Sequence, residues 1–317
     1  INASQDFDLS DEQQLTISAY VKADGDTEVI FQAEQSFGYY IGTHNDGEFA
    51  LTMYFEGYED LCLSNTQITD GNWHHVLGSY DGSEMKIYVD GVLENTCEAG
   101  VLVSQEQSSP ITIGSYRPEE SNYQFNGTID ELSVWGVALE QGQIQEVMYT
   151  DSTWQDDNLV AHYKFDANDG DILYDHSGNA NHGTINGANW NEGFVAPPTA
   201  VTFLVNLRDY VESSGDSLYN GVYIAGGNIG ADNPEDSLFM GHEMSDGNGD
   251  FIYEVTLDLE RNTHYTYKYR IGPATEDWNG NWEGGLEECG EGEWFDRNFD
   301  TDFSSNMIVG PYCFNSC

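Results

Sequence analysis

The sequence has very few basic residues. Lysine and arginine together number 9, against 56 aspartate and glutamate residues, and the formal net charge is −47. A surface of this sign repels nucleic acid and anionic membranes, which excludes both as partners. The acids run through the whole chain, so they indicate a solvated surface suited to a salty medium that screens self-repulsion. Binding of calcium by some of the carboxylates is compatible with that interpretation.

Long apolar runs are absent as well. No segment approaches the roughly 20 apolar residues of a membrane-spanning helix, and neither a starting methionine nor a signal-like apolar stretch is present. We therefore expect no membrane insertion, and we interpret Ile1 as a processed or truncated start. With 39% hydrophobic and 13% aromatic residues the chain has ample material for a core, and its length predicts about two domains.

Cysteine is scarce and lacks the spacing of a metal site. No two of the five cysteines are separated by two residues, and hard carboxylates outnumber soft ligands, so zinc is not expected. Disulfides in an oxidising compartment fit better, which predicts a secreted or cell-surface protein. We pair Cys62 with Cys97, and Cys289 with either Cys313 or Cys317, which leaves one thiol over.

Two sequons for N-glycosylation agree with that location. They begin at Asn2 and Asn126, where the third residue is serine or threonine. Because a three-residue motif often arises by chance, the sequons are weaker signals than the cysteines.

Short β-rich runs alternate with glycine, asparagine and aspartate turns through the first part of the chain. The clearest runs are residues 15–21, 48–55, 73–80 and 85–89. Their close spacing is typical of a sandwich. Asp90-Gly91 predicts a two-residue hairpin, because both turn positions need a positive φ. One short helix is predicted at residues 139–149, and nothing else has a helical pattern.

Several ordered segments in this part resemble the laminin-G-like, concanavalin-type jelly roll. They are LTISAYV at 15–21, WHHV at 73–76 with YDG at 80–82, IYVDG at 87–91, and FNGTIDEL at 125–132. The resemblance covers roughly 150 residues and implies a jelly-roll sandwich. It does not specify a function, because that fold hosts lectins, adhesins, enzymes and structural proteins.

The order of these segments departs from the family pattern. Residues 159–190 resemble the part that usually opens such a domain, but here they follow its body, and the strand that normally precedes residues 6–9 is missing. A sandwich that lacks a strand exposes unpaired backbone groups, which are costly to bury. The gap is therefore expected to be filled either by the chain's own residues 159–165, which alternate as a strand does, or by a strand from a neighbouring subunit.

A proline-rich linker at residues 196–200 separates a first domain, 1–195, from a second, 201–317. Strands are predicted in the second domain at residues 201–207, 221–225, 251–257 and 265–271. Alternation places two sets of side chains on common faces: Phe251, Tyr253, Val255 and Leu257, and Tyr265, Tyr267, Tyr269 and Ile271. This part resembles the immunoglobulin-like, starch-binding-type sandwiches of secreted bacterial proteins. The predicted fold class is all-β, a jelly-roll β-sandwich plus a smaller immunoglobulin-like β-sandwich.

No catalytic arrangement is evident in the sequence. Glycoside hydrolysis needs two carboxylates at a fixed separation, and the Glu-x-Asp-x-x-Glu strand that retaining enzymes of this fold carry is absent. Asp130-Glu131 has no third acid after it, and His242-Glu243 lacks the second histidine of a zinc protease. We therefore predict that the protein is not an enzyme.

Two adjacent histidines, His74 and His75, lie on a predicted strand. Neighbouring strand residues point to opposite faces, so the two cannot both bind one ion. One of them is expected to be a packed core histidine.

Calcium is the cofactor that the sequence best supports. In related jelly rolls the acid equivalent to Asp130 can help to hold a structural calcium, although a turn-bonding or exposed acid is equally compatible. Asp175, with the turn that reaches Asn179, is a second candidate. Residues 246–250 space three oxygen side chains like the start of a calcium loop but lack its distal glutamate, so a hairpin turn is the better interpretation.

Three tryptophans of the second domain, Trp278, Trp282 and Trp294, are candidates for a platform that stacks on sugars. The alternative is that they are buried or cover an edge, which is commoner for tryptophan.

The missing strand, the displaced segment and the lack of catalytic residues favour an extracellular structural protein. We predict the subunit of a self-assembling surface fibre, a homopolymer built by inter-subunit strand contacts in salt or divalent cations that screen its charge. The alternative is a calcium-stabilised glycan-binding adhesin, or the accessory module of a secreted hydrolase.

Overall fold

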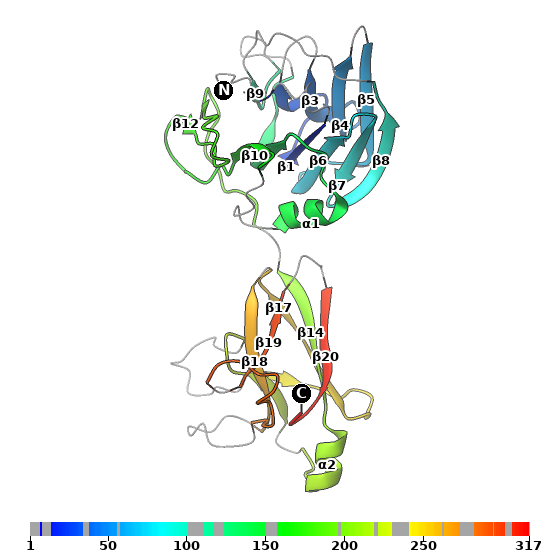
Figure 1. Cartoon of the computed structure of the whole chain (residues 1–317), viewed down its shortest axis with the longest axis vertical. Coiled ribbons are helices and arrows are strands. Elements are labelled where there is room, and N and C mark those ends of the chain that lie inside the picture. The colour runs from blue at the N-terminus through cyan, green and yellow to red at the C-terminus, as the bar shows by residue number, and fades with distance from the viewer. Residues whose placement is uncertain are drawn as a thin grey trace. The chain divides into compact units, whose positions relative to one another are not determined.

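The computed structural model divides the chain into two compact units, Ile1–Val195 and Ala196–Cys317 (Figure 1). It describes residues 7, 14–33, 38–55, 58–100, 111–116, 123–149, 157–195, 198–218, 221–229, 241–261, 263–272, 282–293, 295–301 and 306–316. Strands predominate in both units, so the all-β prediction is confirmed. No helix within these described ranges is long and apolar enough to cross a membrane.

Two antiparallel sheets form the body of the first unit. The six-stranded sheet has, in spatial order, β11 (Leu159–Tyr163), β10 (Gly127–Trp135), β1 (Leu15–Ala23), β6 (His74–Tyr80), β7 (Glu84–Val89) and β8 (Val92–Glu98). The five-stranded sheet has β5 (Tyr58–Gln67), β4 (Glu48–Phe55), β3 (Tyr39–His44), β2 (Val29–Ala33) and β9 (Thr112–Ile113). A separate ribbon pairs β12 (Ile172–Leu173) with β13 (Gly183–Thr184). Each predicted strand is present, with ends displaced by at most two residues.

The core of the first unit follows from strand alternation. In β1, Leu15, Ile17 and Val21 point inward and are fully buried in the cluster between the sheets. Burial of each such side chain stabilises the fold by about 1.5–3 kcal/mol. A smaller cluster around Leu77 and Trp135 lies on the other face of the six-stranded sheet. It includes Leu139, from the segment just before α1, and Ile144, from α1 itself. Helix α1 spans Gln141–Tyr149, two residues shorter than predicted.

The predicted hairpin joins β7 to β8. Val89 is paired directly with Val92, so Asp90 and Gly91 are the two turn residues, and their φ angles are 50° and 74°. Both positive values belong to the turn type that matches the right-handed twist of paired strands. This prediction is confirmed.

The chain itself supplies the strand that the sequence suggested was missing. β11 pairs antiparallel with β10, with Leu132 opposite Tyr163 and Val134 opposite Ala161. Ala161 and Tyr163 are fully buried and belong to the core. The self-filling alternative is therefore the one observed, and the sandwich needs no strand from a neighbouring subunit at this edge.

The second unit is also a sandwich. One sheet contains β17 (Ile252–Leu259), β14 (Thr199–Asn206) and β20 (Asn306–Cys313), and the other contains β16 (His242–Met244), β15 (Val222–Ala225), β18 (His264–Ile271) and β19 (Arg297–Asp300). Both sheets contribute to one core, in which the alternating tyrosines of β18 are buried. β14 begins at Thr199, inside the stretch predicted as a linker, and Phe251 precedes β17 with a positive φ.

Helix α2 (Arg208–Ser214) contradicts the prediction that only one helix is present. None of its residues is buried, so its sequence carries no apolar periodicity that would indicate a helix. It ends at Gly215, whose φ of 72° is the left-handed conformation that glycine adopts without strain.

Candidate functional site

The three predicted metal ligands come from the region around β10 and β11. Asp130 is a residue of β10, whereas Asp175 and Asn179 lie in the segment 174–182 that connects β12 to β13. We call this segment the capping loop, because its side chains bind the backbone of β11. No group of three or more His, Cys, Asp or Glu residues that could hold a metal ion occurs among the described residues.

Asp175 is buried and uses both of its carboxylate oxygens. Oδ1 accepts hydrogen bonds from the backbone N–H of His162 and of Ser177, each at 2.9 Å. Oδ2 accepts from the Ser177 hydroxyl at 2.8 Å and from the backbone N–H of Asn181 at 2.9 Å. A carboxylate has about four lone-pair sites. All of them are occupied, so Asp175 holds the capping loop on β11 and has no lone pair left for a cation.

Several other polar groups of the capping loop bind the carbonyl groups of β11. The Asn179 amide donates to the carbonyl oxygens of Leu159 and Val160 at 2.9 and 3.0 Å. The Asn181 amide donates to Val160 at 3.0 Å, and the backbone N–H of His176 donates to the carbonyl of His162 at 2.8 Å. An edge strand with its backbone groups paired is a poor template for another strand.

Asp130 is only 6% exposed. Its Oδ2 accepts a hydrogen bond from the backbone N–H of Phe194 at 2.6 Å, and a Cβ atom at Gly193 would lie 2.3 Å from the same oxygen. The Phe194 ring stacks on Tyr20, with ring centroids 3.7 Å apart. Burial, reinforced by the neighbouring charge of Glu131, raises the pKa of Asp130 to about 6. Asp130 therefore lies beneath the segment that leads to the second unit.

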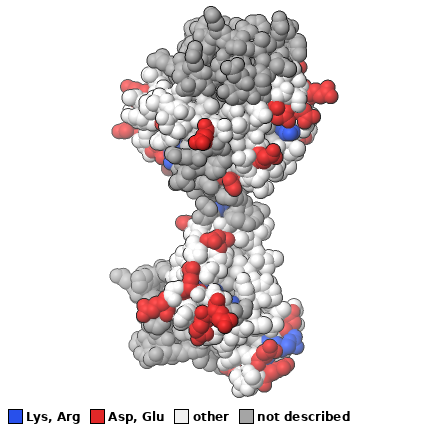
Figure 2. All heavy atoms as spheres, viewed as in Figure 1, with Lys and Arg blue, Asp and Glu red and all other residues white. Residues whose placement is uncertain are grey.

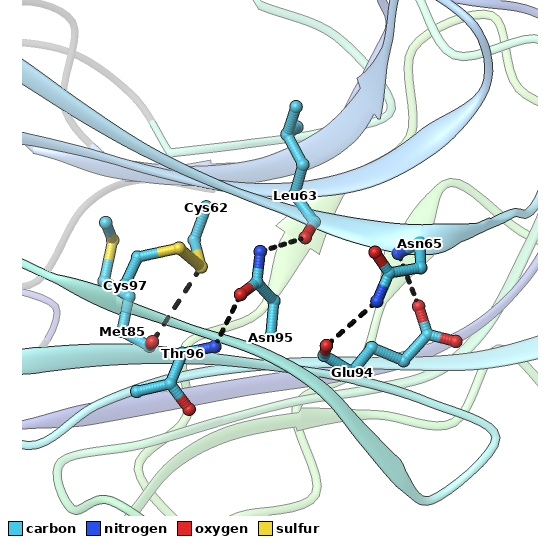
Figure 3. The surroundings of a disulfide bond; sticks show 8 residues. All are labelled: Cys62, Leu63, Asn65, Met85, Glu94, Asn95, Thr96 and Cys97. Atoms are coloured by element: carbon cyan, nitrogen blue, oxygen red, sulfur yellow. Dashed lines mark hydrogen bonds between the residues drawn. A yellow bond between two sulfur atoms is a disulfide. The ribbon is translucent and has the colours of Figure 1, made fainter.

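The opposite edge of the six-stranded sheet is covalently joined to the other sheet (Figure 3). Cys62 of β5 and Cys97 of β8 form the expected disulfide, with Cα atoms 5.8 Å apart. Glu94 accepts hydrogen bonds from the backbone N–H groups of Asn65 and Thr66 at 2.6 and 2.9 Å. The Asn95 amide donates to the carbonyl of Leu63 at 3.1 Å. Side chains of β8 thus occupy backbone groups of β5 that a further strand would need.

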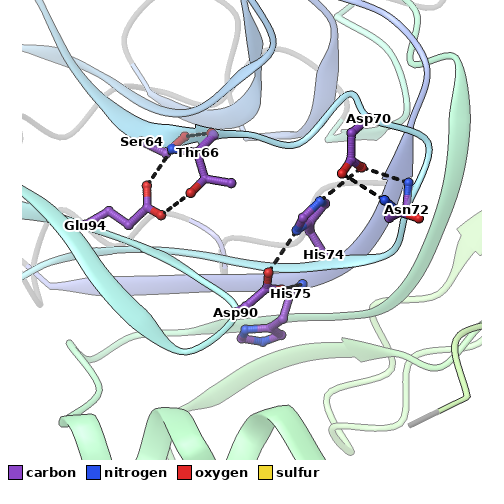
Figure 4. Close-up of polar contacts among 8 residues, drawn as sticks. All are labelled: Ser64, Thr66, Asp70, Asn72, His74, His75, Asp90 and Glu94. Carbon is purple, nitrogen blue, oxygen red and sulfur yellow. Dashed lines mark hydrogen bonds and ion pairs between the residues drawn. The ribbon is translucent and has the colours of Figure 1, made fainter. Parts of the chain in front are cut away.

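The two adjacent histidines point in opposite directions from β6 (Figure 4). His75 is 1% exposed, its Nε2 lies 2.7 Å from the Ser18 hydroxyl, and burial lowers its pKa to about 4. His74 lies between two carboxylates, with Nδ1 2.9 Å from Asp90 and Nε2 3.2 Å from Asp70. The hydrogen bond to Asp90 raises the pKa of His74. One histidine is packed in the fold, as the sequence predicted.

The residues predicted for the second unit fall partly outside the described ranges. Trp278 and Trp294 are outside them, and Trp282 is half-buried, with the Arg270 guanidinium carbon 4.8 Å from the centre of its ring. The cation occupies one face of that indole. The structure therefore does not bring the three tryptophans together within its described part.

The other assignments have mixed outcomes. Cys289 is disulfide-bonded and Cys313 is an exposed free thiol, which excludes Cys313 as its partner, while Cys317 lies outside the described residues. Asn126 is exposed, as a glycosylation site must be, and Asn2 is outside the described residues. Residues 246–250 form a hydrogen-bonded turn in which Asp246 accepts from the backbone N–H groups of Gly249, Asp250 and Phe251, in keeping with the hairpin interpretation.

The ribbon of β12 and β13 carries an exposed aromatic pair that the sequence interpretation missed. Leu173 packs on the core, whereas Tyr174, the next residue along, is 50% exposed. The Tyr174 ring meets His182 edge to face, with centroids 5.4 Å apart. Alternation in Ile172-Leu173-Tyr174 is a possible signal, but the strand is too short for the pattern to stand out.

Acidic side chains are spread over the visible face of both units, with few basic ones among them (Figure 2). This distribution agrees with the net charge of −47 and with an acidic, solvated surface.

Residues 1–145 match the family model of the concanavalin A-like lectin/glucanases superfamily, in its laminin-G form. The first unit therefore contains a concanavalin A-like jelly-roll domain. No curated protein matches the chain.

The chain is also similar to several solved structures. A putative carbohydrate-binding protein from Bacteroides ovatus is 21% identical with a TM-score of 0.45, over 55% of this chain and 54% of that one. A SAP-like pentraxin from Limulus polyphemus is 23% identical with a TM-score of 0.34, over 42% and 68%. Domain 4 of an extracellular arabinanase from Geobacillus stearothermophilus is 22% identical with a TM-score of 0.35, over 43% and 66%. The chain thus spans about half the length of the first of these structures.

Proposed function

We propose that this protein is a non-catalytic carbohydrate-binding protein and that its first unit holds the binding site. The observation that carries the proposal is the match of residues 1–145 to a superfamily of lectins and glucanases. Because the same superfamily includes glucanases, whether this protein binds without hydrolysis depends on the arrangement of the acids in its first unit.

Asp130 is the described acid that comes nearest to a catalytic one. A glycosidase needs one carboxylic acid with a raised pKa and a second carboxylate across the scissile bond. Burial raises the pKa of Asp130 to about 6, and Glu131 and Asp166 are close enough to affect it. However, Asp130 is buried under Gly193 and bonded to the N–H of Phe194. A glycosidic oxygen has no access to it there, which supports binding without hydrolysis.

The edges of the first unit favour this function over the fibre. The strand gap that suggested polymerisation is filled by β11, and the capping loop pairs the outer groups of that strand. The disulfide between Cys62 and Cys97 supports an extracellular location, where such bonds persist. Calcium stays a proposal for Asp130 and Asn179, whereas the carboxylate oxygens of Asp175 are used within the fold.

The test is a binding and hydrolysis screen of the whole chain. We expect calorimetry to detect binding to at least one of maltotriose, cellotriose, xylotriose and mannotriose, with no release of new reducing ends after prolonged incubation. If the chain bound none of these trisaccharides and none of the glycans on a wider array, carbohydrate binding would be contradicted. Hydrolysis that is lost in Asp130→Asn would instead identify a glucanase.

A further inference from the structure

The strongest unassigned feature of the first unit is the outer face of the ribbon formed by β12 and β13. Ile172 is paired with Thr184 and Leu173 with Gly183, so side chains alternate between the core and solvent. Leu173 and Ile185 pack on the core, while Ile172, Tyr174, His182 and Thr184 are all exposed. The solvent-facing side of the ribbon thus carries a tyrosine ring and an imidazole that are in contact with each other, with Ile172 beside them.

Hydrogen bonds fix the backbone on both sides of the aromatic pair. The Trp190 indole N–H donates to the carbonyl oxygen of Gly170 at 3.1 Å. The backbone N–H of Ile185 donates to the backbone carbonyl oxygen of Asp171 at 2.9 Å, and this bond closes the base of the ribbon. Asp175, adjacent to Tyr174, is fixed by its four hydrogen bonds. A ligand that binds here therefore meets a surface already in place, so little conformational entropy is lost on binding.

Hydrogen bonding also sets which polar groups the pair presents. The backbone N–H of Asp175 donates to Nδ1 of His182 at 3.0 Å, so we assign the ring proton to Nε2. The Tyr174 hydroxyl has no hydrogen-bond partner in the described part of the chain. The face thus offers an aromatic ring, one hydroxyl and one N–H donor side by side.

We propose that Tyr174 and His182 form a platform for a neutral sugar. One face of a hexose or pentose ring carries C–H groups that can stack on Tyr174, and its rim carries hydroxyls that match the phenol and the imidazole N–H. The sugar is neutral because the chain carries −47 and Asp171 and Asp175 flank the platform. A second copy of this chain would be repelled by the same charge, and the ribbon is too small for a stable protein interface, which needs about 800 Å² per partner. This inference rests on the proposed carbohydrate binding and assigns its site.

The experiment measures binding of the neutral trisaccharide that the wild type prefers among maltotriose, cellotriose, xylotriose and mannotriose. Tyr174→Ala is expected to weaken binding at least tenfold, Tyr174→Phe only a few-fold because the ring remains, and His182→Ala several-fold. The matched control is Tyr123→Ala, because Tyr123 is 48% exposed in the same unit and also meets another ring, Tyr116, edge to face. That variant is expected to bind as the wild type does, and all variants are checked for an unchanged melting curve.

The possible failures are distinguishable. Binding that survives in Tyr174→Ala and His182→Ala, with the melting curve intact, overturns the platform and leaves the proposed function standing. Tighter binding of α2,3-sialyllactose than of lactose overturns the neutral-sugar assignment. A wild type that binds none of the carbohydrates overturns the proposed function, and the platform with it.

Discussion

Removal of the Asp175 carboxylate should destabilise the first unit and open the edge at β11. Asp175 is 7% exposed and accepts four hydrogen bonds, two of them from backbone N–H groups that are themselves buried, those of His162 and Asn181. In Asp175→Ala these two donors lose their acceptor. The other two donors belong to Ser177, which is only partly buried and can bond to water.

The magnitude follows from the two buried donors. A buried polar group left without a partner costs about 1–3 kcal/mol, so two of them cost about 2–6 kcal/mol. Because the loop lies at the surface and water can enter the space left by the carboxylate, we expect a loss of about 3 kcal/mol in the free energy of unfolding. Asp175→Asn should cost less, since it keeps one oxygen, but it turns an amide N–H₂ toward the N–H of Asn181.

The assay is urea denaturation of the full chain, combined with hydrogen exchange at the amide of His162. Exchange at this amide should accelerate strongly in Asp175→Ala, because the carboxylate that accepts its hydrogen bond has been removed. Asp169→Ala is the control, since Asp169 is exposed in the segment just before the same ribbon and should change stability by less than about 0.5 kcal/mol. A loss below about 1 kcal/mol in Asp175→Ala, with unchanged exchange at His162, would refute the capping role.

Two further predictions concern acid and assembly. Burial holds His75 neutral, with a pKa of about 4 in the folded protein against 6.5 in the unfolded chain. The stability that depends on the neutral form is therefore complete above pH 6.5 and is lost as the pH falls toward 4. The expected loss in the free energy of unfolding between pH 7 and pH 5 is about 2 kcal/mol. Asp130, with its pKa raised to about 6, makes the folded state more stable as the pH falls over the same range, so the wild type must be compared with His75→Gln. The urea stability of His75→Gln should fall less between about pH 7 and pH 5 than that of the wild type. An identical pH dependence of the two proteins would contradict a buried neutral histidine. Gel filtration with light scattering should find a monomer with and without calcium, and concentration-dependent growth would restore the fibre hypothesis.

Most of the fold could be predicted because alternation and turn residues carry it directly. Leu15, Ile17, Ala19 and Val21 occupy every second position of a strand whose inner face is buried, and Asp90-Gly91 favours one kind of turn. Helix α2 could not be found in this way, since none of its side chains is buried. The length of the linker was overestimated because Thr199 and Ala200 resemble loop residues, while pairing with β17 makes them strand.

The Tyr174–His182 pair was missed from sequence, whereas the calcium candidates Asp175 and Asn179 could be located but not interpreted. Asp175 and Asn179 stand out as oxygen-bearing residues around a Ser-Gly turn, which suits a cation and a backbone cap equally well. Their partners decide between the two, and those partners belong to β11, at Leu159, Val160 and His162. Pairing of this kind depends on tertiary structure, so no local pattern reveals it.

The fibre hypothesis requires an edge strand that can pair with a strand from another copy of the chain. In the first unit, β11 is capped by its own loop and β5 by the side chains of β8. In the second unit β20 is an outer strand, and Ile308 on it is 72% exposed, which at first favours strand addition. However, Pro311 within the same strand has no N–H to donate, a common means of protecting an edge. A charge of −47 opposes close packing of two copies at any of these edges. The edges at β11, β5 and β20 therefore each carry a feature that opposes strand addition, and the exposed aromatic face of the β12–β13 ribbon is the better candidate for a surface that binds.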